Sequence, residues 1–137
     1  MPAVLVVEDD DDLREVVVQT LTRVGYRVLG ARDGEDALAR LAEEREVGVI
    51  LLDLMMPRMS GWEFRRQQLA DARLAKVPVV VMSATQTLEQ AAIQADGLLR
   101  KPLSFTALVN TVERFCGRAP SEPRTRRDGE GPIFGTP

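Results

Sequence analysis

The sequence predicts an α/β fold: a doubly wound parallel sheet of five strands with helices on both faces. Short apolar runs alternate five times with longer segments in which apolar residues recur every three or four positions. Such alternation favours a parallel sheet, because right-handed crossovers place the helices on both of its faces. At 137 residues, 45% of them hydrophobic, the chain is long enough for one domain with a buried core.

The first unit joins a buried strand to an amphipathic helix. The strand, Ala3–Val7, ends abruptly at a block of five carboxylates in residues 8–12. Apolar residues at helical spacing follow over residues 13–24, and Gly25 ends that helix. We interpret Asp10, Asp11 and Asp12 as charges that complement the helix dipole, with metal binding as the alternative.

The second unit has the same organisation. Residues 26–30 form a short predicted strand, and Asp33 with Gly34 makes the turn into the next helix. The apolar side of that helix contains Ala37, Leu38, Leu41 and Ala42.

The third strand is a long apolar run that ends at a single aspartate. In residues 47–61, VGVILLDLMMPRMSG, the run reaches Asp53 and gives way at once to turn residues. This pattern is typical of a strand buried on both faces, and in open α/β sheets the carboxyl ends of the strands face the ligand crevice. The next helix is expected to begin near Ser60, with Trp62 and Leu69 facing inward.

Two shorter strands follow. The fourth predicted strand, residues 77–82, ends at Ser83 and is followed by a short alanine-rich helix over about residues 86–94. A brief fifth strand, residues 98–100, ends at Lys101. These two strands bring the predicted sheet to five strands.

The last helix is predicted to begin after Ser104, a good N-cap residue. Its apolar stripe contains Phe105, Leu108, Val109, Val112, Phe115 and Cys116. The only cysteine, Cys116, cannot form an internal disulfide. We interpret it as a buried apolar residue in a reducing compartment, with a regulatory thiol as the alternative.

The composition changes after this helix. Residues 117–137 contain four prolines and four glycines with Arg and Glu between them, so they cannot bury enough apolar surface to fold alone. We therefore expect one folded domain over residues 1–116 and a disordered tail over residues 117–137.

Charge and residue usage exclude several functions. With 21 acidic and 18 basic residues, a net charge of −3, the chain offers no broad basic surface for nucleic acid. The N-terminus has neither the basic start of a signal peptide nor the length of a membrane span, so a cytoplasmic protein without membrane contact is expected. The chain has no histidine, so any phosphoryl or proton chemistry has to use carboxylates, hydroxyls and lysine.

Four of the five predicted strands end in a chemically active group. These groups are Glu8 and Asp9, Asp53, Ser83, and Lys101. The carboxyl ends of parallel strands lie along one edge of the sheet, so the five side chains are predicted to converge there. Three carboxylates that close together repel one another unless a cation lies among them, and oxygen ligands suit Mg²⁺ better than zinc.

The predicted site has the groups needed for phosphoryl transfer. A carboxylate beside Mg²⁺ can act as a nucleophile, so Asp53 is predicted to form an aspartyl phosphate. Mg²⁺, Lys101, and the Ser83 hydroxyl with a backbone N–H near Ala84 would each stabilise charge on the phosphoryl oxygens.

Four segments together resemble the receiver domain of the response regulators of bacterial two-component signalling: LVVEDD, LLDLMMPRMSG, VVVMSA and RKP. The likeness covers residues 3 to about 116, with 44 residues from Asp9 to Asp53 and 30 from Asp53 to Ser83. It implies a flavodoxin-like strand order of 2-1-3-4-5. It also implies that the chain works in a phosphorelay.

The resemblance implies roles for the site residues. Asp53 would accept phosphate from a histidine kinase or phosphotransfer protein. Asp9, Asp53 and the backbone carbonyl of Met55 would bind Mg²⁺, while Glu8 would act through water. Ser83 and Lys101 would contact the phosphoryl group, together with the Ala84 backbone N–H. The peptide bond between Lys101 and Pro102 would be cis, as is common in the family.

The sequence departs from the family pattern at the predicted output side. An aromatic residue is usual three positions before the lysine, whereas Leu98 stands here and has no ring to rotate between buried and exposed states. Only 18 residues separate Ser83 from Lys101, which shortens the expected fourth helix. An apolar Met55 cannot orient a hydrolytic water, so slow self-dephosphorylation is expected.

Three functions are compared. The leading hypothesis is a stand-alone phosphoacceptor switch, a monomer or weak dimer, whose phosphorylated form is recognised by an output protein. The second is a scaffold of the same fold that works through constitutive protein binding, because Leu98 and the short fourth helix alter the output route. The third is a Mg²⁺-dependent phosphohydrolase, which would need an acidic residue two positions after Asp53 where Met55 stands.

Overall fold

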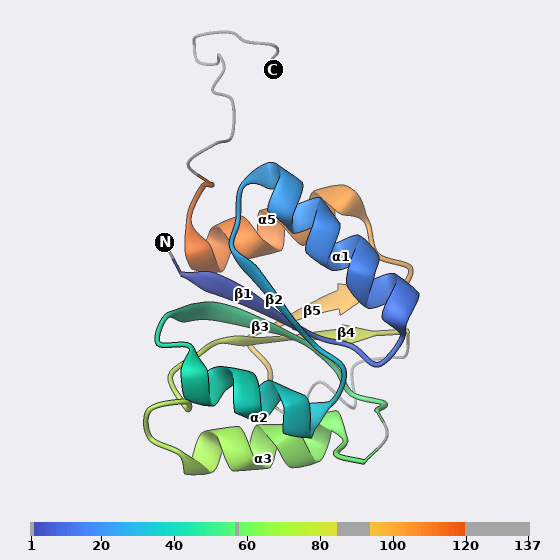
Figure 1. The fold of residues 1–137 in the computed structure, drawn as a ribbon. Helices are drawn as coiled ribbons and strands as arrows, with labels where there is room; N and C mark the ends of the chain where they lie inside the picture. The colour runs from blue at the N-terminus through green and yellow to red at the C-terminus, as the bar shows by residue number, and fades with distance from the viewer. Residues whose placement is uncertain (1, 57, 85–93, 120–137) are drawn as a thin grey trace, which may run out of the picture.

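Five parallel strands form one sheet between two layers of helices in the computed structural model, which describes residues 2–56, 58–84 and 94–119 (Figure 1). The strands are β1 (Ala3–Val7), β2 (Val28–Ala31), β3 (Val47–Asp53), β4 (Val79–Ser83) and β5 (Gly97–Arg100). Their order is β2-β1-β3-β4-β5, with every neighbouring pair parallel. The predicted doubly wound sheet and its flavodoxin-like strand order are confirmed.

The helices divide between the two faces of the sheet. They are α1 (Asp11–Val24), α2 (Gly34–Glu43), α3 (Gly61–Ala70) and α5 (Phe105–Cys116). Figure 1 shows α1 and α5 on one face and α2 and α3 on the other. The predicted short helix near residues 86–94 falls almost wholly on residues 85–93, which lie outside the described part of the chain.

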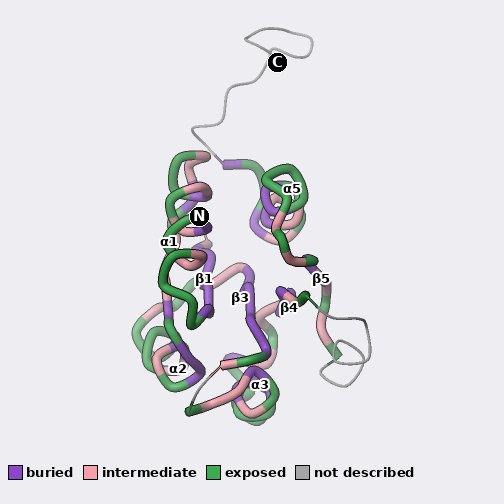
Figure 2. The backbone as a smooth tube through the Cα atoms, turned by 90° about the vertical axis from the view of Figure 1, so that its right-hand side faces the viewer, coloured by how far each residue is buried: buried purple, intermediate pink, exposed green. Residues whose placement is uncertain are grey.

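Strand β3 lies at the centre of the sheet and is buried on both faces, as predicted. Val49 and Leu51 belong to the core cluster under α1 and α5, whereas Ile50 and Leu52 belong to the cluster under α2 and α3. All four side chains are fully buried, because alternate residues of a strand point to opposite faces. Figure 2 shows this burial concentrated along β1, β3 and β4.

The residues predicted to begin or end helices are found at those positions. The Asp10 carboxylate caps α1 by accepting hydrogen bonds from the backbone N–H groups of Asp12 and Leu13. Gly25 closes the same helix with a φ of 122°, a left-handed conformation that glycine adopts without strain. The caps of the other helices are Asp33, Ser60 and Ser104.

The prediction for the inward face of α3 is wrong. Trp62 and Leu69 are 36% and 44% exposed, whereas Phe64 and Gln68 are completely buried. Gln68 tolerates burial because its side-chain amide donates hydrogen bonds to the carbonyls of Leu74, at 2.7 Å, and Val77, at 3.0 Å. A polar residue with partners outside its own helix therefore occupies the face that apolar periodicity assigned to Trp62 and Leu69.

The described part of the chain packs slightly beyond the predicted boundary of the domain. The Tyr26 hydroxyl donates a 2.7 Å hydrogen bond to the Gly117 carbonyl, and Ala119 is buried in the cluster under α1 and α5. The Gly117 carbonyl and the Ala119 side chain thus contact the folded domain, while Gly117 and Arg118 are otherwise exposed. The rest of the predicted tail, residues 120–137, lies outside the described residues.

Candidate functional site at the carboxyl edge of the sheet

Three carboxylates meet where β1 and β3 end. β1 and β3 are neighbours, with Val7 paired to Leu52, so the residues that follow them lie side by side. One carboxylate oxygen from each of Glu8, Asp9 and Asp53 lies within 4.8 Å of the other two. Glu8 and Asp53 are buried, whereas Asp9 is exposed. The predicted convergence of these three residues is therefore present in the structure.

Lys101 reaches the same place from the end of β5. Its Nζ lies 2.9 Å from Glu8 Oε1 and 3.6 Å from Asp53 Oδ1. Partial burial by itself lowers the pKa of Lys101. The hydrogen bond to Glu8 and the negative charge of Asp53 raise it by more, so the net shift is upward. One ammonium group thus contacts two of the three carboxylates, so the acidic groups at the site outnumber this cation. The Lys101–Pro102 peptide bond is cis, as the resemblance implied.

The electrostatics at Asp53 fit a bound cation. Burial and the neighbouring Glu8 carboxylate raise the pKa of Asp53 to about 7, although Lys101 and the backbone N–H of Met55 oppose this. That N–H donates a 3.3 Å hydrogen bond to Asp53 Oδ1. A carboxylate in this position gains stability from a nearby cation, and an all-oxygen donor set suits a hard ion such as Mg²⁺. The residues present therefore fit the implied metal.

The remaining predicted site residues lie at the same edge. Ser83 is the last residue of β4, the strand beside β3, and its carbonyl accepts a 2.9 Å hydrogen bond from the Lys101 backbone N–H. Ala84 follows it and is exposed. Met55 is 74% exposed at the start of the loop after β3. The contacts of Ser83, Ala84 and the Met55 carbonyl with phosphate or metal stay predictions.

Trp62, predicted to face inward, instead lies beside the site. It lines a hollow of about 410 Å³ together with Asp9 and the residues Leu54, Met55, Met56 and Ser60. Trp62 is the only tryptophan in the chain, so its fluorescence can be followed without interference from another tryptophan.

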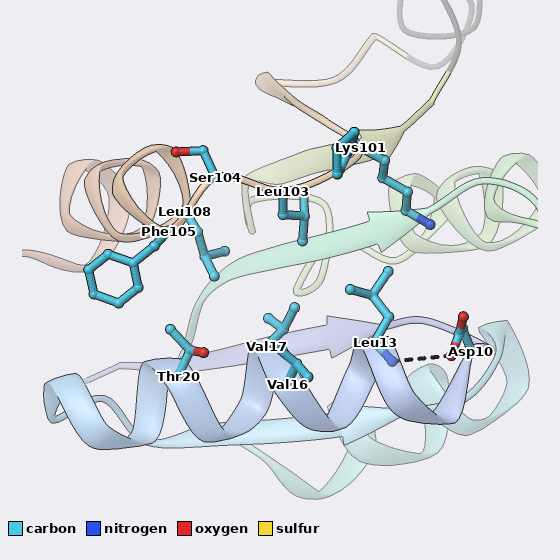
Figure 3. Close-up of a pocket in the computed structure, with 11 residues that line it drawn as sticks. Asp10, Leu13, Val16, Val17, Thr20, Lys101, Leu103, Ser104, Phe105 and Leu108 are labelled. Atoms are coloured by element: carbon cyan, nitrogen blue, oxygen red, sulfur yellow. Dashed lines mark hydrogen bonds between the residues drawn. The ribbon is translucent and has the colours of Figure 1, made fainter.

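A second hollow, of about 490 Å³, opens between α1 and the start of α5 (Figure 3). Lys101 and Asp10 line one end, and most of the other lining side chains, such as Leu13 and Leu108, are apolar. Phe105 belongs to this lining and is 62% exposed, so this member of the predicted apolar stripe of α5 does not lie in the core. As the first residue of the helix, it precedes the α5 residues that pack on the sheet.

One pair of residues beside the site was not predicted. Arg58, in the loop after β3, contacts Asp33 at the N-terminus of α2. The sequence marks both positions as turns but does not indicate that they meet, because the contact joins two different strand–helix units.

Comparisons with known proteins agree with this geometry. A family model described as the response regulator receiver domain matches residues 4–113. The response regulator RR06 of Streptococcus pneumoniae is 33% identical over 121 residues, covering 84% of this chain and 53% of RR06. The two-component response regulator ORR5 of Oryza sativa subsp. japonica is 32% identical over 124 residues, covering 85% of this chain and 87% of ORR5.

Solved structures give the same result. The chemotaxis protein CheY4 of Vibrio cholerae has a TM-score of 0.77 and 33% sequence identity, over 84% of this chain and 98% of CheY4. The lengths of the relatives differ: this chain spans about half of RR06 and of the transcriptional regulatory protein GltR of Pseudomonas aeruginosa.

The sheet is doubly wound, and three carboxylates and a lysine lie at its carboxyl edge. These features place the chain in the class of α/β domains with a ligand site at the strand ends. With the family match, the class becomes specific: the chain belongs to the response regulator receiver domains. Members of this family are phosphoacceptors of two-component signalling that interact with histidine kinases or phosphotransfer proteins and bind Mg²⁺ at an acidic site. Among the described residues, no helix is both long and apolar enough to span a bilayer.

Proposed function

We propose that this chain is a single-domain response regulator in which Asp53 accepts a phosphoryl group from a histidine kinase or phosphotransfer protein. The observation that carries the proposal is the grouping of Glu8, Asp9 and Asp53 within 4.8 Å, with the Lys101 ammonium 3.6 Å from Asp53. A cytoplasmic location, a monomer or weak dimer, and the absence of direct contact with nucleic acid belong to the same proposal.

The transfer proceeds by attack of an Asp53 carboxylate oxygen on the phosphorus of a phosphohistidine. A P–O bond forms as the P–N bond breaks, and the bonding electron pair leaves with the imidazole nitrogen of the donor. Lys101 is already shared between Glu8 and Asp53, so a small movement brings its ammonium to a phosphoryl oxygen. The Ser83 hydroxyl and the Ala84 backbone N–H stabilise another oxygen.

A divalent metal ion would offset the negative charge of the three carboxylates that Lys101 does not neutralise. Asp9, Asp53 and the Met55 carbonyl would hold Mg²⁺, and Glu8 would bind it through water. When bound there, Mg²⁺ supplies positive charge to the transferred phosphoryl group. Glu8 and Lys101 remain paired at 2.9 Å in the described arrangement, which agrees with an indirect role for Glu8.

The phosphorylated state is expected to be long-lived, and the protein is not expected to be an enzyme. Turnover would need a side chain that orients a water toward the phosphorus atom. Met55 is exposed beside the site and has no polar group for this task. Slow self-dephosphorylation is therefore part of the proposal.

A second candidate function is a scaffold with constitutive protein binding. The observation that favours it is Leu98, which packs against the core cluster under α2 and α3 and has no ring to rotate. In that case the fold would present the same surface whether or not Asp53 carries phosphate.

Intact mass after incubation with Mg²⁺ and acetyl phosphate separates these functions. The switch predicts a stable gain of one phosphoryl group that Asp53→Asn abolishes and that Asp12→Asn, a change at an exposed carboxylate, leaves intact. No gain in mass would support the scaffold. Rapid release of inorganic phosphate without a stable product would support a phosphohydrolase and contradict the proposal.

A further inference from the structure

The loop between β3 and α3 is attached to the N-terminus of α2 by an ion pair. Arg58 Nε and a terminal guanidinium nitrogen lie 3.0 Å and 2.9 Å from Asp33 Oδ2. The other carboxylate oxygen, Oδ1, accepts a 2.9 Å hydrogen bond from the backbone N–H of Asp36 and so caps α2. Asp33 is 3% exposed, and both of its carboxylate oxygens have hydrogen-bond partners. We call this contact the Arg58–Asp33 clamp.

The clamp is one of the contacts that the described residues of the loop make with the start of α2. Arg58 has a φ of 66°, a left-handed conformation that costs a non-glycine residue energy and persists where surrounding contacts hold it. The next residue, Met59, packs on Gly34: a Cβ on that glycine would lie 2.7 Å from Met59 Cγ. Two successive loop residues are therefore held against the start of α2.

The same loop begins at the phosphoacceptor. The Met55 backbone N–H donates to Asp53 Oδ1 at 3.3 Å, and the Gly61 N–H donates to the Leu54 carbonyl at 2.9 Å. A Cβ on Gly61 would lie 2.7 Å from the Leu54 Cα, so the two ends of the loop touch. The described residues of the loop are thus attached at its base and, through Arg58 and Met59, at the start of α2, while residue 57 lies outside the described part of the chain.

We propose that Arg58 and Asp33 are positioning residues for the metal site: by holding Arg58 against α2, they keep the Met55 backbone beside Asp53, where its carbonyl would bind Mg²⁺. This inference rests on the proposed function, which assigns a metal ligand to the Met55 carbonyl. Neither clamp residue belongs to the carboxylate group at the sheet edge. Partners that orient metal ligands commonly affect metal affinity by tenfold or more.

An effect of charge on Mg²⁺ affinity can be distinguished from an effect of positioning the loop. Removing the Arg58 cation favours binding of Mg²⁺ by simple Coulomb attraction, and removing the Asp33 anion disfavours it. The clamp requires both partners, so loss of either one weakens binding. The direction of the Arg58 effect therefore distinguishes the two mechanisms.

The test is a MgCl₂ titration of the full chain, followed by Trp62 fluorescence and, in parallel, by calorimetry. Arg58→Gly removes the guanidinium and accepts a positive φ without strain. Asp33→Asn keeps an N-cap of equal quality and removes the charge. The matched control is Glu35→Gln, because Glu35 is 60% exposed and its 3.5 Å ion pair with Arg58 is the outer contact.

We expect Arg58→Gly and Asp33→Asn each to raise the dissociation constant for Mg²⁺ by on the order of tenfold, and Glu35→Gln to leave it unchanged. The double variant should bind no more weakly than either single variant, since both remove one interaction. Arg58→Lys should restore part of the affinity. Circular dichroism confirms that each variant is folded.

Two results would overturn the inference: wild-type affinity in both single variants, or tighter binding by Arg58→Gly with weaker binding by Asp33→Asn. A wild-type chain that binds no Mg²⁺ and gains no phosphate would instead refute the proposed function. The two failures are thus distinguishable.

Discussion

Gln68→Leu tests the view that the buried face of α3 is held by a polar side chain. Gln68 is completely buried, and its amide donates to the Leu74 and Val77 carbonyls. Its Oε1 accepts a 2.8 Å hydrogen bond from Arg65, which also donates to the Gln94 carbonyl at 2.9 Å. Leucine has a similar size but cannot replace any of these bonds. The Val77 carbonyl and one guanidinium N–H then lose this partner, whereas the Leu74 carbonyl keeps its 3.0 Å hydrogen bond from the Val77 N–H.

The expected loss of stability follows from these contacts. Each buried polar group without a partner costs about 1–3 kcal/mol, and burying a leucine returns about 2 kcal/mol. With two such groups we expect a net loss of about 2 kcal/mol, which lowers the urea midpoint by about 1 M for an m-value of about 2 kcal/mol/M. Urea unfolding followed by circular dichroism measures this shift.

Gln67→Leu is the matched control. Gln67 is the neighbouring residue in α3, is exposed, and makes one surface hydrogen bond to Glu63. The same substitution there should change stability by less than about 0.5 kcal/mol. Equal midpoints for the two variants, or a Gln68→Leu variant as stable as the wild type, would refute the reasoning.

Three further predictions concern single side chains. Met55→Asn, which adds a polar group beside Asp53, should shorten the half-life of the phosphorylated protein several-fold in a phosphate-release assay; an unchanged half-life would contradict the role assigned to Met55. Burial raises the pKa of Cys116 to about 11, so a disulfide reagent at neutral pH should modify the thiol slowly until denaturant is added. Burial works against a low pKa at Asp33, but the Asp36 N–H and Arg58 outweigh it and lower the pKa below 3.8. Stability from this carboxylate is therefore complete above about pH 4 and lost as pH falls through the lowered pKa, so Asp33→Asn should flatten the acid limb of a stability–pH profile.

The site was predictable because its geometry follows from strand ends. An apolar run that stops at a polar residue identifies the carboxyl end of a strand, and parallel pairing brings such ends together without further information. Glu8, Asp53 and Lys101 meet for this reason, although 93 residues separate the first from the last.

Features that depend on partners from other segments were not predictable. Apolar periodicity placed Trp62 inside because it ranks side chains by hydrophobicity, whereas Gln68 is buried because carbonyls of a later segment accept its hydrogen bonds. The Arg58–Asp33 clamp joins two loops that the sequence describes only as turns. The burial of Ala119 similarly requires a surface that exists only after the helices have packed.

The outer strands of the sheet have a consequence for the behaviour of the protein at high concentration. β2 and β5 form the two margins and are four residues long, against seven for the central β3. A short margin offers few backbone groups to the strand of another molecule, which is how natural sheets avoid fibrous aggregation. The short margins therefore disfavour association between two copies by continuation of the sheet.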